Sequence, residues 1–337
     1  MKQISIIGLS RAGKTCYTFA MAKTMKRGIN GITIFAPDSE QRDELDMGWR
    51  TIRREQTWPA GNANDIFYNF QCMLNLRNVM DFCWKDFRGG SLNRFDEISR
   101  KYRPEFCSYL QHSDGMIFFI AGDMMNRILN DSTDAEDNLE DLEKLNDLIL
   151  SNSDKVNQIP ITIAITKSDL LDNNAKNAVF EIVKTIFPSL FTRGNNVKVL
   201  IVPVSLGQNL GNGDQGQTVA GQIFADPKEG HIHLPIMFNL YHYLKEYIAD
   251  IRQDISNMEQ ELRQHGQVIN IASGHTAFGR WWRGEDLDEL KNERQRMLNK
   301  IEDTKHELDQ QESNLEQVRS EFTKDCQYYV NGIPKSL

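Results

Sequence analysis

Short apolar runs alternate with longer amphipathic segments along most of the chain. Alternating apolar positions favour strands, and apolar residues spaced three and four apart favour helices. Their succession predicts an α/β fold in which a mostly parallel sheet carries helices on both faces and binds ligands at its carboxyl edge. A turn is expected at Arg77-Asn78 and a long Gly-rich loop at 207–230. The expected strands are 4–7, 31–35, 66–76, 79–84, 116–121, 161–165 and 197–204, and the expected helices are 15–27, 39–54, 92–111, 134–150 and 175–186.

The apolar spacing changes at about Leu234. Two runs, Tyr241 to Leu262 and Leu287 to Phe322, place apolar residues three and four apart between charged flanks, which is typical of coiled coils. The intervening segment contains glycines and the pair Trp281-Trp282, so we expect an antiparallel coiled-coil hairpin with an aromatic tip. The predicted organisation is an α/β domain at 1–233, a helical hairpin at 234–325 with its tip at about 266–284, and a C-terminal tail at 326–337.

The first expected strand leads directly into a phosphate-binding pattern, G-x-x-x-x-G-K-[ST], over residues 8–15. Backbone N–H groups of such a loop surround phosphates, and the following helix adds a partial positive charge at its N-terminus. Lys14 is expected to reach the β- and γ-phosphates, and the Thr15 hydroxyl is expected to ligate Mg²⁺. The sequence therefore predicts a nucleoside triphosphate site. Its expected contacts are Gly8, Ser10, Arg11, Ala12, Gly13, Lys14, Thr15 and Cys16.

Composition and charge limit which partners and which cellular location are expected. The chain has 337 residues and a formal net charge of −8, which argues against nucleic acid as its main partner. No stretch approaches the roughly 20 apolar residues of a membrane span. The first residues form a strand and the phosphate loop, so no signal peptide is expected. The 5 cysteines are scattered without C-x-x-C spacing, which favours reduced thiols and a cytoplasmic location.

The expected strand at 161–165 runs into Thr166-Lys167-Ser168-Asp169, which resembles the [NT]-K-x-D guanine motif of GTPases. A carboxylate at Asp169 can accept hydrogen bonds from guanine N1 and N2, whereas adenine offers no such donor pair. Lys167 is expected to lie along the base and to support the phosphate loop. Ser205-Leu206 follows the last expected strand, at a position similar to that of a strand-end serine in GTPases, and this resemblance implies that Ser205 supports the guanine from behind. The nucleotide is therefore expected to be GTP or GDP.

A second Mg²⁺ element is expected after the fourth strand, where Asp86-Phe87-Arg88-Gly89 fits D-x-x-G. Asp86 would hold Mg²⁺ through water, and the Gly89 amide would contact the γ-phosphate.

These elements, in this order, resemble the Ras-like GTPases over about residues 1–206. Trp58-Pro59-Ala60-Gly61 is similar to the bacterial double-GTPase group, which is found in multi-gene conflict and defence cassettes. The resemblance implies a switch threonine on Mg²⁺ and the γ-phosphate, for which Thr57 is the available hydroxyl and Asn62 the alternative. Many relatives carry a glutamine directly after D-x-x-G, and Gly90 stands there in this chain. Hydrolysis would then be slow, unless a partner or a nearby arginine, Arg11 or Arg88, assists.

The sequence thus predicts a Mg²⁺-dependent, slowly hydrolysing GTP switch that signals through the hairpin to an unidentified protein partner. Its expected catalytic residues are Lys14, Thr57, Arg11 and Arg88, and its expected metal ligands are Thr15, Asp86 and Thr57. Two alternatives stay open. One is a dynamin-like GTPase that assembles into oligomers and touches membrane through Trp281 and Trp282. The other is a GTP-binding scaffold without useful hydrolysis.

Overall fold

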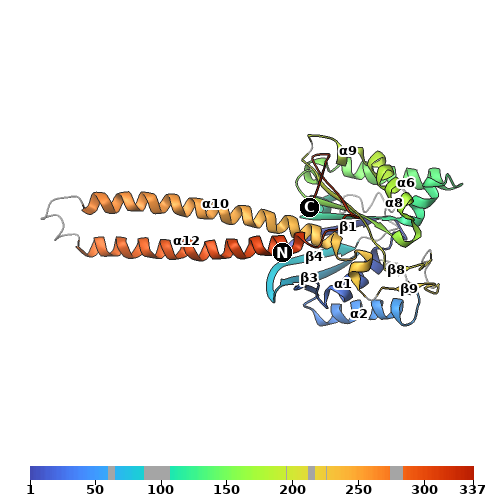
Figure 1. The fold of residues 1–337 in the computed structure, drawn as a ribbon, viewed down its shortest axis with the longest axis horizontal. Helices are drawn as coiled ribbons and strands as arrows, with labels where there is room; N and C mark the ends of the chain where they lie inside the picture. Colours follow the sequence, from blue (N-terminus) through green and yellow to red (C-terminus); the bar gives the residue numbers. More distant parts are fainter. Residues whose placement is uncertain (60–64, 87–106, 195, 212–216, 225, 274–283) are drawn as a thin grey trace. The chain divides into compact units, whose positions relative to one another are not determined.

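The computed structural model describes residues 1–59, 65–86, 107–194, 196–211, 217–224, 226–273 and 284–337. The chain divides into two units, one formed by Met1–Asn239 with Glu321–Leu337 and the other by Leu240–Ser320. The first unit is an α/β domain and the second is a helical hairpin, as the apolar pattern predicts (Figure 1).

A sheet of nine strands in the described residues forms the frame of the first unit, in the order β11-β10-β7-β6-β5-β1-β4-β3-β2. The strands β7, β6, β5, β1 and β4 are mutually parallel, and the pairings outward from β7 and β4 are antiparallel. The strand bounds are β1 Lys2–Gly8, β2 Ile32–Phe35, β3 Ile66–Leu74, β4 Arg77–Asp86, β5 Gly115–Ala121, β6 Pro160–Thr166, β7 Lys198–Pro203, β10 Gln327–Val330 and β11 Ile333–Lys335.

Helices cover both faces of this sheet because successive side chains of its strands point to opposite sides (Figure 1). In β5, Phe118 joins the core cluster that includes Met125 of α5, whereas Phe119 lies against Tyr17 of α1 with ring centroids 4.9 Å apart. The helices of the first unit are α1 Lys14–Met25, α2 Ser39–Arg53, α5 Gly122–Leu129, α6 Ala135–Leu150, α7 Ser153–Val156, α8 Asn173–Ile186 and α9 Pro188–Phe191, with 3₁₀ helices η1 Ser168–Leu170 and η2 Pro227–Gly230.

The expected elements differ from these in several places. The helices α5, α7 and α9 were not expected. The expected Gly-rich loop at 207–230 contains the short strands β8 Gly207–Gln208 and β9 Gln222–Ile223 and the helix η2. Of the helix expected at 92–111, residues 107–111 are helical and the remainder lies outside the described residues.

The turn between β3 and β4 is at Asn75-Leu76, so the expectation of a turn at Arg77-Asn78 was wrong. Asn75 and Leu76 have φ of 50° and 66°, the two consecutive left-handed residues of a tight hairpin turn. Leu76 is apolar and therefore extended the expected strand to residue 76, although its side chain is 89% exposed in the structure.

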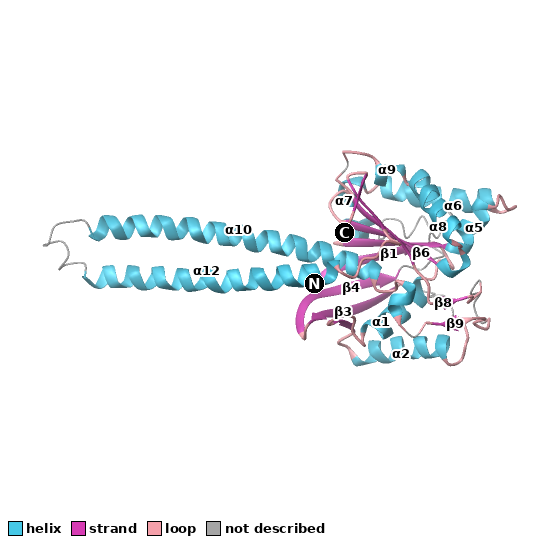
Figure 2. Ribbon diagram, in the orientation of Figure 1, coloured by secondary structure: helices cyan, strands magenta, loops and turns pink. Residues whose placement is uncertain are grey.

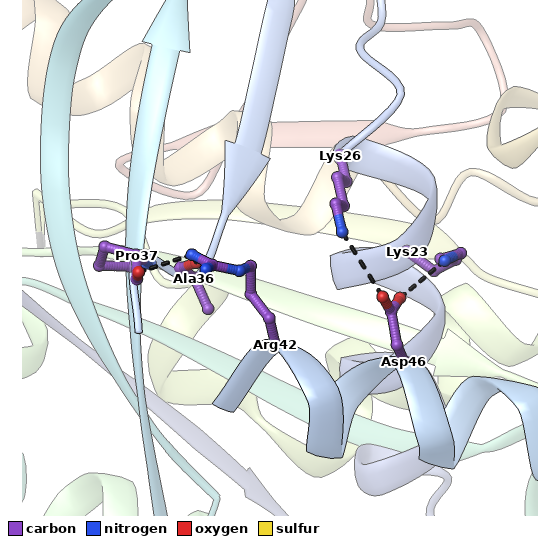
Figure 3. A network of polar contacts seen from close by, with 6 residues as sticks. All are labelled: Lys23, Lys26, Ala36, Pro37, Arg42 and Asp46. Atoms are coloured by element: carbon purple, nitrogen blue, oxygen red, sulfur yellow. Dashed lines mark hydrogen bonds and ion pairs between the residues drawn. The ribbon is translucent and has the colours of Figure 1, made fainter. Parts of the chain in front are cut away.

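Helix α2 contacts α1 through ion pairs and contacts the end of β2 through hydrogen bonds (Figure 3). Asp46 accepts from Lys23 at 2.7 Å and lies 3.5 Å from Lys26. Burial alone would raise the pKa of Asp46, but Lys23 and Lys26 keep that pKa below its usual value. The Arg42 guanidinium donates to the carbonyl oxygens of residues 36 and 37. These contacts set the position from which the chain continues into residues 56–58.

The expected C-terminal tail contains two strands of the sheet. Strand β10 pairs antiparallel with β7, and β11 pairs with β10. Tyr328 of β10 is 8% exposed and packs against Phe238 at the start of α10, with ring centroids 5.4 Å apart. The segment after the hairpin therefore forms part of the α/β domain.

The second unit consists of the long helices α10 Leu234–Ser273, from residue 240 onward, and α12 Gly284–Arg319 (Figure 2). Arg252 bonds Glu312 at 2.6 Å and Lys305 bonds Glu259 at 2.8 Å, so the helices run antiparallel. Their facing sides bury mainly apolar residues, and Trp281 and Trp282 lie outside the described residues. No helix in the described part of the chain is long and apolar enough to cross a membrane. The buried seam residues include Leu244, Ile248, Ile251, Ile255, Ile301 and Val318.

Because β10 is a paired strand of the sheet, substitutions in β10 and in β11 should change the free energy of unfolding to different extents. Tyr328→Ala removes a buried aromatic ring and should lower the free energy of unfolding by about 3 kcal/mol in urea titrations. Ile333→Ala, on β11 where the side chain is 38% exposed, is the matched control and should change it by no more than about 0.5 kcal/mol. Equal effects of the two substitutions would contradict a structural role for β10.

Candidate functional site

The described residues of the phosphate loop and of the expected guanine motif, with Asp86 and Ser205, meet at the carboxyl edge of the parallel strands. Strand register fixes this arrangement, since Gly8 pairs with Phe119, Ala121 with Thr166, and Ile165 with Pro203. The phosphate loop follows β1, the guanine-type motif follows β6, and Ser205 follows β7. Asp86 is the last residue of β4, level with Ile6 of β1. Segments far apart in sequence therefore form one candidate site.

The loop after β1 has the geometry of an anion site. Gly13 adopts the left-handed conformation, with φ of 82°, and α1 starts at the next residue without a side-chain cap or an acidic residue in its first turn. The first N–H groups of a helix lack partners within the helix, and the helix dipole favours an anion there. This end of α1 can therefore receive phosphate oxygens.

Lys14 lies inside that loop. Its ammonium donates to the carbonyl oxygens of Gly8 at 2.8 Å and Leu9 at 3.1 Å, and the side chain is buried. Burial lowers the pKa of Lys14, and the charge of Asp86 opposes that change. An incoming phosphate would find a cation already directed into the loop.

The other loop residues differ in exposure. Gly8 is required by close packing, because a Cβ there would lie 2.6 Å from the carbonyl oxygen of Phe119. Ala12 is buried, whereas Ser10 and Arg11 are exposed at the loop surface. Cys16 lies in the first turn of α1, where burial raises its pKa to about 12 although the Lys167 charge opposes the change. Of the two exposed side chains, Arg11 is the longer and can extend farther from the loop.

Two oxygen ligands of the type that Mg²⁺ prefers are brought together below this loop. The Thr15 hydroxyl donates to Asp86 Oδ2 at 3.2 Å, and Asp86 is 2% exposed. Hydroxyl and carboxylate oxygens suit a hard cation, so the donor set fits the predicted Mg²⁺. Thr57 is arranged differently, because its hydroxyl donates to the Glu55 carbonyl at 3.1 Å. Asn62, Arg88, Gly89 and Gly90 lie outside the described residues.

The motif after β6 is tied to the phosphate loop by Thr166. Its hydroxyl donates to the Ala12 carbonyl at 2.8 Å, which links the candidate base site to the candidate phosphate site. Lys167 adopts a left-handed conformation, with φ of 51°, and forms an ion pair with Asp123 at 2.9 Å. A Cβ at Gly122 would lie 2.7 Å from the Thr166 carbonyl oxygen, so only glycine permits this approach.

Both oxygens of the Asp169 carboxylate have protein donors. The Ser205 hydroxyl lies 2.8 Å from Oδ1 and 2.6 Å from the Gly207 carbonyl oxygen and can donate to either, and the Leu210 amide donates to Oδ2 at 3.2 Å. Ser205 Oγ also accepts from the Gly207 amide at 3.1 Å, and the Leu206 carbonyl accepts from the Phe224 amide at 2.9 Å. Each carboxylate oxygen has two lone pairs, so Asp169 can accept further hydrogen bonds while these donors hold its orientation.

Three participants were missing from the sequence analysis. Asp123 could have been found, because it is a carboxylate two residues after a buried strand at the ligand-binding edge. The role of the Leu210 amide could not have been predicted, because any residue at that position would supply the same N–H. The contact between residues 217–219 and residues 56–58 could not have been predicted either, because it is made by backbone hydrogen bonds.

No protein-family model and no curated protein matches the chain. Among solved structures it is similar to an ADP-ribosylation factor-like small COPII coat GTPase from Encephalitozoon cuniculi in complex with GDP, with 11% identity, a TM-score of 0.34 and coverage of 73% of this chain and 83% of that one. It is also similar to two structures of an oligomerised bacterial dynamin pair, described as a mechanism for long-range sensing and tethering of membranes.

The two dynamin structures are 14% and 13% identical to this chain, with TM-scores of 0.36 and 0.38. The matches cover 93% and 94% of this chain but 48% of each dynamin chain, so this chain spans about half their length.

Proposed function

We propose that this protein is a Mg²⁺-dependent GTPase that acts as a nucleotide-controlled switch. The observation that carries the proposal is the joining of three groups at one sheet edge: the Lys14 loop, the Thr15–Asp86 pair and the Asp169 carboxylate. The Lys14 loop is suited to binding phosphates, and the Thr15–Asp86 pair is suited to binding a hard cation. The Asp169 carboxylate is suited to accepting hydrogen bonds from the edge of a guanine. Guanosine triphosphate with its Mg²⁺ would use all three.

At the phosphate end, the amides at the start of α1 would bind the α- and β-phosphates, and Lys14 would bind the β- and γ-phosphates. Thr15 and Asp86 would hold Mg²⁺, which neutralises phosphate charge when it is bound. The Gly89 amide would contact the γ-phosphate. Arg11 or Arg88 would be the source of any additional positive charge near the transferred group.

At the base end, Asp169 would accept hydrogen bonds from guanine N1 and N2, with Ser205 and Leu206 behind the base and Lys167 alongside it. The Ser205 hydroxyl and the Leu210 amide support this role because they hold the carboxylate in one orientation. Adenine lacks this donor pair, so its binding would cover the remaining lone pairs of Asp169 without hydrogen bonds to them, which is unfavourable. This penalty is the proposed basis of selection for GTP over ATP.

Thr57 would have to change partners to ligate Mg²⁺, because its hydroxyl bonds Glu55 in the present conformation. Such a rearrangement on γ-phosphate binding, and its reversal on hydrolysis, is the proposed switch. The helical hairpin would pass this change to a protein partner through Trp281 and Trp282. A role in a bacterial defence system would fit the double-GTPase resemblance of residues 58–61.

Asp169→Asn tests the proposed reading of the base. The asparagine amide can donate to the C2 oxygen of xanthine but repels the C2 amine of guanine, so the variant should prefer XDP to GDP in calorimetric titrations. Asp172→Asn is the matched control, since Asp172 caps α8 through the Ala175 amide and asparagine caps equally well. An Asp169→Asn variant that keeps the wild-type preference for GDP would contradict the guanine assignment.

The isolated protein should hydrolyse GTP slowly, because Gly90 replaces the residue expected to position water. We expect multiple-turnover phosphate release below about 10⁻² s⁻¹, as for unassisted small GTPases. Lys14→Ala should abolish it, which controls for contaminating hydrolases. Turnover near 10 s⁻¹ in the monomer would contradict this expectation, and Arg11→Ala and Arg88→Ala would then show whether a cis arginine is responsible.

A further inference from the structure

The segment between Ser205 and η2 connects two parts of the candidate site. Its described residues form an inner arm, 207–211, and an outer arm, 217–223, which together we call the bridging segment. Gly207 pairs with Ile223, and Gln208 pairs with Gln222. A Cβ at Gly207 would lie 2.1 Å from the Gln222 carbonyl oxygen, so the two arms are in very close contact. A displacement of one arm should therefore move the other.

The inner arm reaches the candidate base site. Leu210 is 5% exposed, and its amide supplies one of the two anchors of the Asp169 carboxylate. The other anchor, Ser205, directly precedes the bridging segment. The position of the inner arm thus helps to set the orientation in which Asp169 can receive a base.

The outer arm reaches the candidate switch residue. Thr218 and Thr57 form an antiparallel bridge, flanked by hydrogen bonds from the Trp58 amide to the Gln217 carbonyl at 3.1 Å and from the Val219 amide to the Gln56 carbonyl at 2.7 Å. Val219 is 3% exposed, whereas Gln217 and Thr218 are exposed. Val219 is therefore the buried side chain of the outer arm at this contact.

We propose that the bridging segment holds Thr57 away from the metal site until a γ-phosphate is bound, and that it couples the phosphate end of the site to the base end. This inference rests on the proposed GTPase function. The backbone hydrogen bonds between residues 56–58 and the outer arm form a short ladder, and we call this arrangement closed. In it, the Thr57 hydroxyl donates to the Glu55 carbonyl. If Thr57 moves to ligate Mg²⁺ with Thr15 and Asp86, we expect the hydrogen bonds between residues 56–58 and residues 217–219 to break.

The coupling follows from the geometry of the two arms. Movement of the outer arm displaces the inner arm through the β8–β9 pairing, and the Leu210 anchor of Asp169 is weakened. GDP, which has no γ-phosphate, leaves the ladder closed. Opening the ladder requires free energy, which lowers the net affinity for GTP but leaves the affinity for GDP unchanged.

Hydrogen exchange of the wild-type protein tests this arrangement, after calorimetry has established that it binds GDP and a non-hydrolysable GTP analogue with Mg²⁺. Without nucleotide and with GDP, the amides of Trp58, Val219 and Leu210 should be protected. With the GTP analogue, all three should exchange at least about tenfold faster. Unchanged or stronger protection with the analogue would overturn the proposal while leaving the proposed GTPase function intact. No nucleotide binding at all would overturn both.

A matched pair of variants provides the second test. Val219→Ala truncates the buried side chain of the outer arm, so it should lower the cost of opening and raise the ratio of GTP-analogue to GDP affinity about tenfold, equivalent to ~1.4 kcal/mol. Thr218→Ala, at the adjacent exposed side chain, should leave that ratio unchanged. Circular dichroism would establish that both variants are folded. Equal affinity ratios in wild type and Val219→Ala would overturn the proposal.

Discussion

The register of the parallel strands is the constraint on which the candidate site depends. It places the ends of β1, β4, β6 and β7 at one edge, and the Thr166–Ala12 hydrogen bond joins two of the following loops directly. A shift of one residue in any of these strands would turn its side chains to the opposite face and separate the phosphate loop from the base motif. The apolar core that fixes the register is therefore also what assembles the site.

Much of this arrangement could be predicted from local sequence. Strands β1, β5, β6 and β7 are mainly apolar, and the phosphate-binding pattern follows the first of them, so the sheet and its carboxyl edge could be predicted from the pattern. Asp86 and Asp169 were expected at this edge because the D-x-x-G and T-K-x-D patterns follow expected strands, and the structure places Asp86 at the end of β4 and Asp169 after the end of β6. The helical hairpin was equally accessible, since its apolar spacing persists over many turns.

The features that could not be predicted depend on backbone geometry or on pairing between distant segments. The turn at Asn75-Leu76 requires two left-handed residues, one of which is a leucine. Strand β10 has four residues, too few for a clear periodicity, and is stabilised by pairing with β7. The bridging segment contacts Asp169 and residues 56–58 through main-chain amides, so no residue type marks its role.

We propose that one sheet edge binds both the phosphates and the base of a guanine nucleotide. Isothermal calorimetry of the wild-type protein with GDP and with ADP, each with Mg²⁺, tests this proposal directly because the two ligands differ only in the base. We expect saturable binding of GDP and no measurable binding of ADP. Equal affinity for the two nucleotides, or binding of neither, would contradict it.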